Sequence, residues 1–436
     1  MTELLLIKDS LANKISYYHF LLLMASLPFD MFYSHLILIS LIIHTLIQLK
    51  KNTIKPVFKL RTIALQSVFF VTVLSTIYTR NPNKAFAEWG TQITILLIPI
   101  VFCLNPLDIK KYRPNLLMVF AWVSTATIVY LYADPLLTIR HYHLPFSVLF
   151  SSYFTNHNFS QPIAIHATFF SMQVALALLY LLSVFIKERL FYHKLFYLCC
   201  CGILLAGLLQ LSSKSIFIAT MVIINLALPY FLLRGASRRR FLIISASLTI
   251  LVIAGILSFG PFKQRYINGL RNDLSKSVAG ETDDTRLARW NVSLELIAKS
   301  PVIGYGAGSE IGLLQDSFFN KKLYSSYLNR LNTHNEYLSF LLKSGAIGLL
   351  IYVSTLAFGF AISFRQKDLT FFTFMLIIAF VSMSENLLDV DKGIIFYAFF
   401  FSFFVFSDEE RTAAKEPVKI IINNSVKATK QLVASS

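Results

Sequence analysis

The chain has 436 residues, of which 56% are hydrophobic and only 14% are charged, and its mean hydropathy is +0.62. This composition excludes a soluble globular domain and indicates an integral membrane protein. The net charge of +17 comes from short basic clusters between apolar runs, where orientation signals lie, so nucleic-acid binding is not indicated.

Apolar runs long enough to cross a bilayer follow one another along most of the chain. A spanning helix needs about 20 apolar residues. We therefore predict an all-α integral membrane protein with about twelve transmembrane helices, the first of which is short and ends at Pro28. The runs are 16–30, 33–49, 62–79, 86–103, 115–134, 164–186, 194–211, 215–233, 240–259, 345–363, 369–388 and 392–407.

Basic residues gather in alternate connections between these runs. Positive charges in short loops mark the cytoplasmic side, so we predict that both termini are cytoplasmic. The two longest connections, 135–163 and 260–344, then share the opposite face, and connections of that length usually carry function. The basic clusters are Lys50, Lys51, Lys55, Lys59 and Arg61; Lys110, Lys111 and Arg113; Lys187, Arg189 and Lys194; Arg234 and Arg238 to Arg240; Arg365 and Lys367.

The predicted organisation has four parts. Residues 1–259 carry transmembrane helices 1 to 9, 260–344 form a long helical loop between the ninth and tenth helices, 345–407 carry helices 10 to 12, and 408–436 form a cytoplasmic tail. The four cysteines lie in or beside apolar runs, where three neighbours on one helix cannot converge on a metal. We interpret them as helix-packing residues and predict no metal site and no cofactor.

An amphipathic helix is predicted within the long loop, in the stretch "DDTRLARWNVSLELIAKS". Asp284 can cap its start, and Pro301 with Gly304 ends it. Arg286 and Arg289 are three residues apart and project from one side. Two fixed guanidiniums suit a diphosphate, since each binds phosphate oxygens in bidentate fashion, but spacing alone slightly favours the alternative that they contact lipid headgroups or merely solvate the helix. The apolar positions are Leu287, Trp290, Leu294 and Ile297.

Two short turns belong to the same outer face. "LSSKS" places Lys214 at the mouth of the helix bundle, where a lysine is often an interfacial residue. "GYGAG", residues 304–308, could cradle an anion with its amides, but it follows no strand and is interpreted as a turn. The outer-face histidines lack metal-ligand spacing and are candidates for acceptor or sugar contacts: His141, His143, His157 and His166.

The stretch "THNEYL" starts the next helix. Thr333 and Glu336 match a capping box, which predicts Thr333 as the cap and His334 in the first turn. The positive end of a helix disfavours imidazolium, so His334 would be neutral and able to accept a proton as a general base. Glu336 is then a capping residue or orients His334. An ordinary interfacial histidine is the alternative. Glu385 and Asn386, near the outer end of the run 369–388, fit the rim of the same site.

The order "SSKS", "TRLARW", "SPVIGYGAG" and "THNEYLSFLLKSGAIGLL" resembles the O-antigen ligase and O-antigen polymerase superfamily of bacterial envelope glycosyltransferases. The strong resemblance covers about 285 to 350 and extends loosely over the whole chain. Lys214 departs from the pattern, which has an arginine in that turn. The matching positions are Arg286 before Trp290, Pro301, Gly304 with Gly306, His334 to Leu338, and Gly345 with Gly348.

The resemblance implies metal-independent glycan transfer from undecaprenyl diphosphate to an acceptor hydroxyl at the periplasmic face of the bacterial inner membrane. It makes His334 and Arg286 the catalytic residues, and Lys214, Arg289, Asn335 and Glu336 the substrate-binding residues. The expected partners are the lipid-linked glycan donor, a lipid A core sugar or another glycan as acceptor, and membrane lipids, with no nucleic acid.

Three activities of this kind stay open. The ligase is favoured by the length of the chain and the compact "THNEYL" region, while a polymerase of O-antigen or exopolysaccharide, or a protein O-oligosaccharyltransferase, would use another acceptor. A flippase or transporter of lipid-linked glycans would also have twelve spans. A transporter should carry ionisable residues at mid-membrane, whereas the polar residues here gather at the outer surface.

Overall fold

The structure is a computed structural model, and it describes residues 6–49, 55–275 and 284–407. Throughout these residues the fold is helical, and they contain no β-strand. The predicted tail, 408–436, lies outside the described residues, as do Lys50, Lys51 and the first residues of the stretch "DDTRLARW" up to 283.

Every predicted apolar run overlaps a helix, so the all-α membrane fold is confirmed. Within the described residues, eight helices are long and apolar enough to cross a membrane, and Met31–Ile47 and Leu369–Val381 are shorter apolar helices. The total of about twelve spans stays a prediction. The helices that overlap the runs are α2 (Leu11–Ser26), α3 (Met31–Ile47), α4 (Leu60–Ser75), α5 (Pro82–Leu104), α6 (Ile109–His141), α8 (Ala167–Lys187), α9 (Phe191–Leu211), α10 (Lys214–Val222) continued by η7 (Ile223–Ala227) and α11 (Leu228–Leu232), α12 (Gly235–Ser258), α18 (Glu336–Gln366), α19 (Leu369–Val381) and α20 (Asp391–Phe406).

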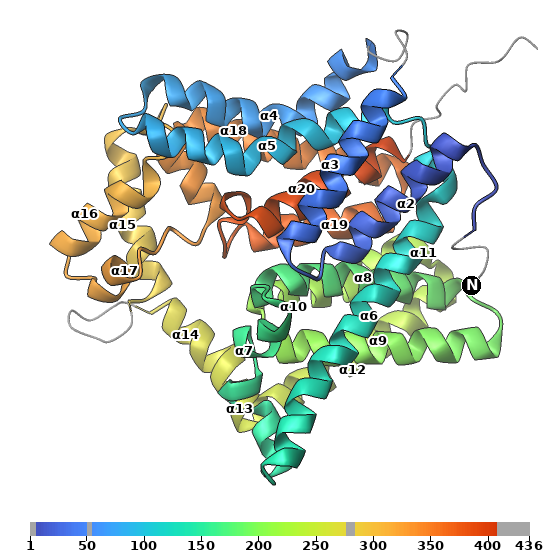
Figure 1. The fold of residues 1–436 in the computed structure, drawn as a ribbon. Coiled ribbons are helices and arrows are strands. Elements are labelled where there is room, and N and C mark those ends of the chain that lie inside the picture. Colours follow the sequence, from blue (N-terminus) through green and yellow to red (C-terminus); the bar gives the residue numbers. More distant parts are fainter. Residues whose placement is uncertain (1–5, 50–54, 276–283, 408–436) are drawn as a thin grey trace, which may run out of the picture.

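Helix α20 lies at the centre of the bundle, between α3 and α19 in the view of Figure 1. Nearly all of its side chains are buried, since it is apolar all round and has no polar face to turn outwards. Its phenylalanines pack against aromatic rings of neighbouring helices. Phe399 lies 5.5 Å from Phe102 of α5, and Phe400 lies 5.0 Å from Phe120 of α6, measured between ring centroids.

The two longest connections meet at one end of the bundle, and most of the second forms the left edge of Figure 1. The side of the membrane that this end faces stays a prediction. The first connection contains η4 (Phe146–Phe150), η5 (Ser152–Phe154), α7 (His157–Ser160) and η6 (Gln161–Ile163). The second contains α13 (Gly260–Phe262), the π-helix η8 (Lys263–Asn268), α14 (Gly269–Asp273), α15 (Arg286–Lys299), α16 (Glu310–Asn320) and α17 (Tyr324–Leu328).

The opposite end of the bundle carries basic connections. Arg113, at the start of α6, forms a 2.6 Å ion pair with Asp368, and its guanidinium donates to Ser407 after α20. Arg238 of α12 donates to the carbonyls of Pro229 and Leu233 at the end of α11. Arg113 and Arg238 therefore also link the ends of neighbouring helices through these contacts.

The "GYGAG" stretch is a turn, as interpreted, and it packs against a break in α18. Gly345 interrupts that helix with φ +62°, and a Cβ atom there would lie 2.2 Å from the carbonyl oxygen of Val302. The amides of Tyr305 and Gly306 donate to the carbonyls of Leu342 and Lys343. These amides are thereby satisfied within the protein, which leaves no anion cradle at this pair.

The helix α15 is confirmed, but its predicted cap is wrong. Thr285, not Asp284, is the N-cap, because its hydroxyl accepts from the amide of Ala288. The Asp284 carboxylate instead accepts a 2.6 Å hydrogen bond from the amide of Ser326 in α17. A tertiary contact has therefore taken the side chain that the local pattern assigned to the cap.

Candidate active site

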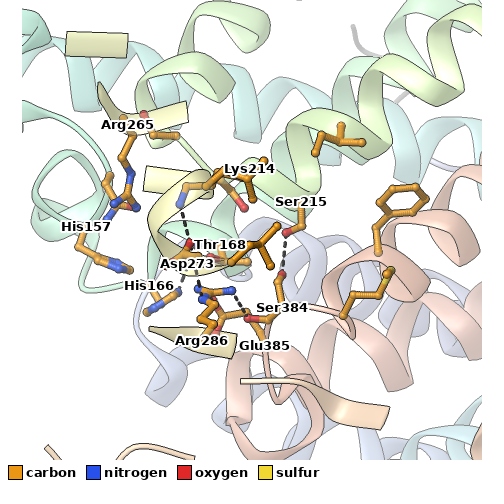
Figure 2. Close-up of a pocket in the computed structure, with 18 of the residues that line it drawn as sticks. His157, His166, Thr168, Lys214, Ser215, Arg265, Asp273, Arg286, Ser384 and Glu385 are labelled. Atoms are coloured by element: carbon orange, nitrogen blue, oxygen red, sulfur yellow. Dashed lines mark hydrogen bonds and ion pairs between the residues drawn. The ribbon is translucent and has the colours of Figure 1, made fainter. Parts of the chain in front are cut away.

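A cavity of about 460 Å³ opens where the two long connections meet the helix ends (Figure 2). Six segments form its wall: the start of α7, the entry to α8, the turn between α9 and α10, the stretch from η8 to α14, the start of α15, and the loop after α19. Its lining is charged on one side and apolar on the other. The lining residues are Asn156, His157, His166, Thr168, Ser212, Ser213, Lys214, Ser215, Ile218, Arg265, Leu270, Asp273, Leu274, Arg286, Trp290, Phe380, Met383, Ser384 and Glu385.

Lys214 and Arg286 converge on one carboxylate, as Figure 2 shows. The Lys214 ammonium lies 2.6 Å from the Asp273 carboxylate, and Nε of Arg286 lies 3.9 Å from the same oxygen. Ser212, in the left-handed conformation with φ +53°, ends α9 and starts the turn that carries Lys214. The two cations predicted to share a site are thus brought together by an acid that the sequence analysis did not single out.

Arg286 also reaches the loop after α19. Its guanidinium donates a 2.9 Å hydrogen bond to the carbonyl of Ser384 and lies 3.6 Å from the Glu385 carboxylate. The Ser384 hydroxyl donates to Ser215 at the start of α10, which fixes the loop against the turn that carries Lys214. Arg286 is therefore held with its charged end in the cavity.

Glu385 joins Arg286 to His334. One carboxylate oxygen lies 3.1 Å from Nδ1 of His334, and the other faces Arg286. Burial by itself would raise the pKa of Glu385, but the hydrogen bond and charge of His334 and the charge of Arg286 lower it below its usual range. The carboxylate is therefore ionised at neutral pH and fixes the orientation of the imidazole. His334 itself does not line the cavity, but it contacts Glu385, which does.

The predicted capping box is wrong. Asn335 is the N-cap of α18, with its side chain accepting from the amide of Leu338, and the helix begins at Glu336. His334 precedes the helix in the left-handed conformation with φ +46°, so the helix-dipole argument for a first-turn histidine does not apply. The Thr333 hydroxyl donates instead to the side chain of Asn386.

A buried polar network explains this local departure. The Glu310 carboxylate accepts 3.0 Å hydrogen bonds from the Thr333 amide and from the Asn386 side chain. The oxygen of the Asn386 side chain in turn accepts from the amide of Asn335. Nearby, the Lys343 ammonium lies 2.8 Å from the Asp389 carboxylate. Since every contact in this network crosses between elements, it fixes His334 and the loop with Glu385 relative to each other.

The remaining predicted substrate-binding residues lie outside the cavity wall. Glu336 is buried, and its carboxylate accepts a 2.8 Å hydrogen bond from the amide of Leu388, so it does not orient His334 in this structure. Arg289 is 6% exposed, and burial together with the charge of Arg286 lowers its pKa to about 10. Asn335 serves as the helix cap. Substrate contact by these three residues stays a prediction.

Asp273 and Arg265 line the cavity without having been singled out from the sequence. They belong to the stretch 260–275, which matches no motif. One signal was present, because Asp273 is the single acidic residue of that stretch, beside Lys263, Arg265 and Arg271. An isolated acid among cations at a predicted anion site indicates a partner for one of them.

The fold and the site together define a class of protein: a polytopic helical membrane protein with a cation-lined cavity at one end of its bundle. A family model described as O-antigen ligase matches residues 199–353, which include the turn with Lys214, the whole second connection and His334. This part of the chain is therefore similar to the O-antigen ligase family, which confirms the resemblance found in the sequence. No curated protein matches the chain.

Proposed function

We propose that the protein is an O-antigen ligase-like glycosyltransferase of the bacterial inner membrane. In this proposal it moves a glycan from undecaprenyl diphosphate to a hydroxyl of a lipid A core sugar, and the cavity faces the periplasm with both termini in the cytoplasm. The observation that carries the proposal is the continuous contact from His334 through Glu385 to Arg286 at the edge of a cation-lined cavity.

His334 acts as the general base. Its Nδ1 contacts the Glu385 carboxylate, so in the neutral ring Nδ1 carries the proton, while Nε2 has a free lone pair. Nε2 takes the proton of the acceptor hydroxyl as that oxygen bonds to the anomeric carbon. Glu385 then stabilises the imidazolium, as an orienting carboxylate does for other catalytic histidines.

The leaving group departs from the opposite face of the anomeric carbon. The bond between that carbon and the diphosphate oxygen breaks, and its electron pair stays on the diphosphate, which predicts inversion of configuration. Arg286 and Lys214 stabilise the growing negative charge in a site partly shielded from water. These cations supply the charge stabilisation that a metal provides in other transferases, so we propose a metal-independent reaction. The apolar wall, with Ile218, Phe380 and Met383, suits the first isoprene units of the donor.

The test is turnover by purified His334→Gln protein supplied with undecaprenyl-diphosphate glycan and acceptor. Glutamine keeps hydrogen bonding but cannot take up a proton to become cationic, so product formation should fall by at least about 100-fold. Donor binding should stay near the wild-type level, because the diphosphate is held by other residues. His193→Gln is the matched control, since His193 is exposed and outside the cavity wall. Wild-type turnover by His334→Gln would remove His334 from catalysis.

The acceptor is identified by the lipopolysaccharide of a deletion strain. A ligase predicts full-length polymer that stays on its lipid carrier and is missing from the core. Core capped by single repeats would instead identify a polymerase, and unchanged lipopolysaccharide with loss of protein glycosylation would identify an oligosaccharyltransferase.

A further inference from the structure

We propose that Arg265 is a second phosphate-binding residue of the cavity, opposite Arg286 and Lys214, and that it makes the site select a diphosphate over a monophosphate. This inference rests on the proposed function, because it assigns residues to the two phosphates of the donor.

Arg265 is the unpaired cation of the cavity wall. Lys214 and Arg286 are paired with Asp273 and Glu385, whereas Arg265 forms no ion pair or hydrogen bond with any residue in the described part of the chain, and its buried Nε has no partner. The wall thus carries three cationic side chains and two carboxylates, which leaves Arg265 as the cation without a paired carboxylate among the described residues. Arg265 is half-buried, and its Nε is fully buried without a partner, which costs free energy unless a ligand completes it.

The backbone around Arg265 is fixed by its neighbours. Arg265 belongs to the π-helix η8, a conformation often found at functional sites because it turns a side chain away from the regular helical direction. The next residue, Tyr266, is buried, and its hydroxyl donates a 3.2 Å hydrogen bond to the carbonyl of Leu209 in α9. Its ring packs 5.2 Å from Phe217 of α10. The guanidinium is therefore carried on an anchored backbone.

His157 adds a neutral donor beside Arg265, as Figure 2 shows. The two residues also share a smaller hollow of about 270 Å³ that adjoins the cavity. Burial and the charge of Arg265 lower the pKa of His157, which keeps its ring neutral at physiological pH. Nδ1 of His157 accepts a hydrogen bond from the amide of Ala167, so the ring proton lies on Nε2 and can be donated to an anion.

The two sides of the cavity then hold different phosphates. Arg286 lies in the chain of contacts that leads to His334, so it and Lys214 belong to the phosphate bonded to the sugar. Arg265 and His157 face the cavity from the other side and would bind the phosphate bonded to the lipid. Lys214, in the turn between α9 and α10, offers a point charge that cannot bind a phosphate in bidentate fashion. Arg265 supplies a second guanidinium that can do so, from another element.

The test compares farnesyl diphosphate with farnesyl monophosphate as probes for the full-length protein in lipid nanodiscs. Wild-type protein should bind the diphosphate more tightly. In Arg265→Gln the affinity for the diphosphate should fall by about tenfold or more, while that for the monophosphate changes by less than about threefold, since one charge-assisted contact is lost. Arg265→Lys keeps the charge but loses the bidentate geometry of the guanidinium, so it should keep part of the preference for the diphosphate over the monophosphate. Arg271→Gln is the control, because Arg271 lies on the adjoining α14, is exposed and is absent from the cavity wall.

The outcomes separate the two proposals. If Arg265→Gln and Arg265→Lys keep the wild-type preference for the diphosphate while glycan transfer persists in the wild type, the inference about Arg265 is wrong and the proposed function stands. If the wild-type protein binds neither probe and transfers no glycan, the proposed function fails. Arg265→Lys also provides the answer if Arg265→Gln does not fold, because a diphosphate preference weaker than that of the wild type in a folded protein supports the inference.

Discussion

Glu385 gives His334 and Arg286 a common partner. Among the described residues, the two predicted catalytic residues form no hydrogen bond or ion pair with each other, yet each lies within 3.6 Å of a different oxygen of this carboxylate. A buried carboxylate shared by a histidine and an arginine couples the base to the cation that stabilises the leaving group. Substitutions at either residue should therefore also alter the behaviour of Glu385.

The Arg286 series tests the anion site. Arg286→Lys keeps the charge but loses the hydrogen bond geometry to Ser384, and Arg286→Ala loses both, so turnover should fall in that order. The protein level in the membrane should stay near normal, because the side chain points into the cavity. Turnover is measured on purified protein at saturating acceptor. Full activity of Arg286→Ala would reduce Arg286 to a lipid-headgroup contact. Lys214→Arg should be tolerated, whereas Lys214→Glu should not.

The dependence of the unfolding temperature on pH under acidic conditions tests the contact between Glu385 and His334. The folded-state pKa of Glu385 is below the ordinary value of 4.5, so its stabilising contribution is present above that value and is lost as the pH falls through the lowered pKa. In His334→Gln a neutral amide replaces the imidazole, so the charge of His334 no longer lowers the pKa of Glu385, while burial still raises it. The difference in unfolding temperature between wild type and His334→Gln should therefore shrink as the pH falls from about 5.5 to about 3.

The control for this measurement is a background without the carboxyl group. In Glu385→Gln, adding His334→Gln should give a difference that no longer varies over the same pH range. A gap between wild type and His334→Gln that stays constant in the native background would contradict the assigned contact.

The sequence identified the chemistry of the site better than its local geometry. His334, Arg286 and Lys214 could be predicted because they lie in a recognisable order of motifs. The cap at Thr333 could not, because Glu310 and Asn386 take its amide and hydroxyl, and both partners are distant in the chain. Arg265 was missed for a similar reason, since its direction depends on a π-helical turn that no periodicity indicates.

At the scale of elements, glycines allow the second connection to pack tightly on the bundle. The "GYGAG" turn reaches the broken part of α18 closely enough for backbone hydrogen bonds, with the Gly306 amide 2.8 Å from the Lys343 carbonyl. Only a residue without a Cβ atom fits such an approach at positive φ. Because Lys343 also pairs with Asp389, this contact places the start of α18 and the loop with Glu385 in register with α15.

Gly345→Ala tests this contact. A Cβ atom would lie 2.2 Å from the Val302 carbonyl oxygen, and φ of +62° is itself strained for alanine. We expect a loss of more than about 2 kcal/mol, seen as a marked fall in the thermal unfolding midpoint in detergent. Gly312→Ala in α16 is the matched control, because a Cβ there meets no atom within 4 Å. That variant should be neutral or stabilised by up to about 1 kcal/mol. Equal effects of both substitutions would contradict the tight contact.

Apolar length predicted the helices well, because burial in lipid leaves the backbone few alternatives to a helix. It predicted their ends less well. Helix α18 begins nine residues before the run that starts at 345, since the amphipathic turns from Glu336 to Ser344 pack on α15 and not in lipid. The short helices of the second connection follow tertiary contacts and were predicted only at α15, where the apolar spacing is regular.

At the scale of the whole molecule, the placement of charge agrees with a single orientation. The cavity lies at one end of the bundle, and the basic connections around Arg113 and Arg238 lie at the other. Because lysine and arginine in short loops stay on the cytoplasmic side, the cavity is expected to face outwards. A donor lipid with its diphosphate at that surface would then meet the site without crossing the bilayer.

Helix α12 offers the direct test of this orientation. Its 24 residues span about 36 Å, enough to cross the hydrocarbon core, and it leads from the basic connection into the cavity wall. The test uses a background without the four native cysteines. Asn272→Cys places an exposed thiol beyond the end of the span, and Ser237→Cys places one at its first turn. A membrane-impermeant maleimide added to intact spheroplasts should label Asn272→Cys, and should label Ser237→Cys only after the membrane is permeabilised. The reverse pattern would put the cavity in the cytoplasm, where a periplasmic acceptor could not reach His334, and would remove the proposed ligase reaction together with the orientation.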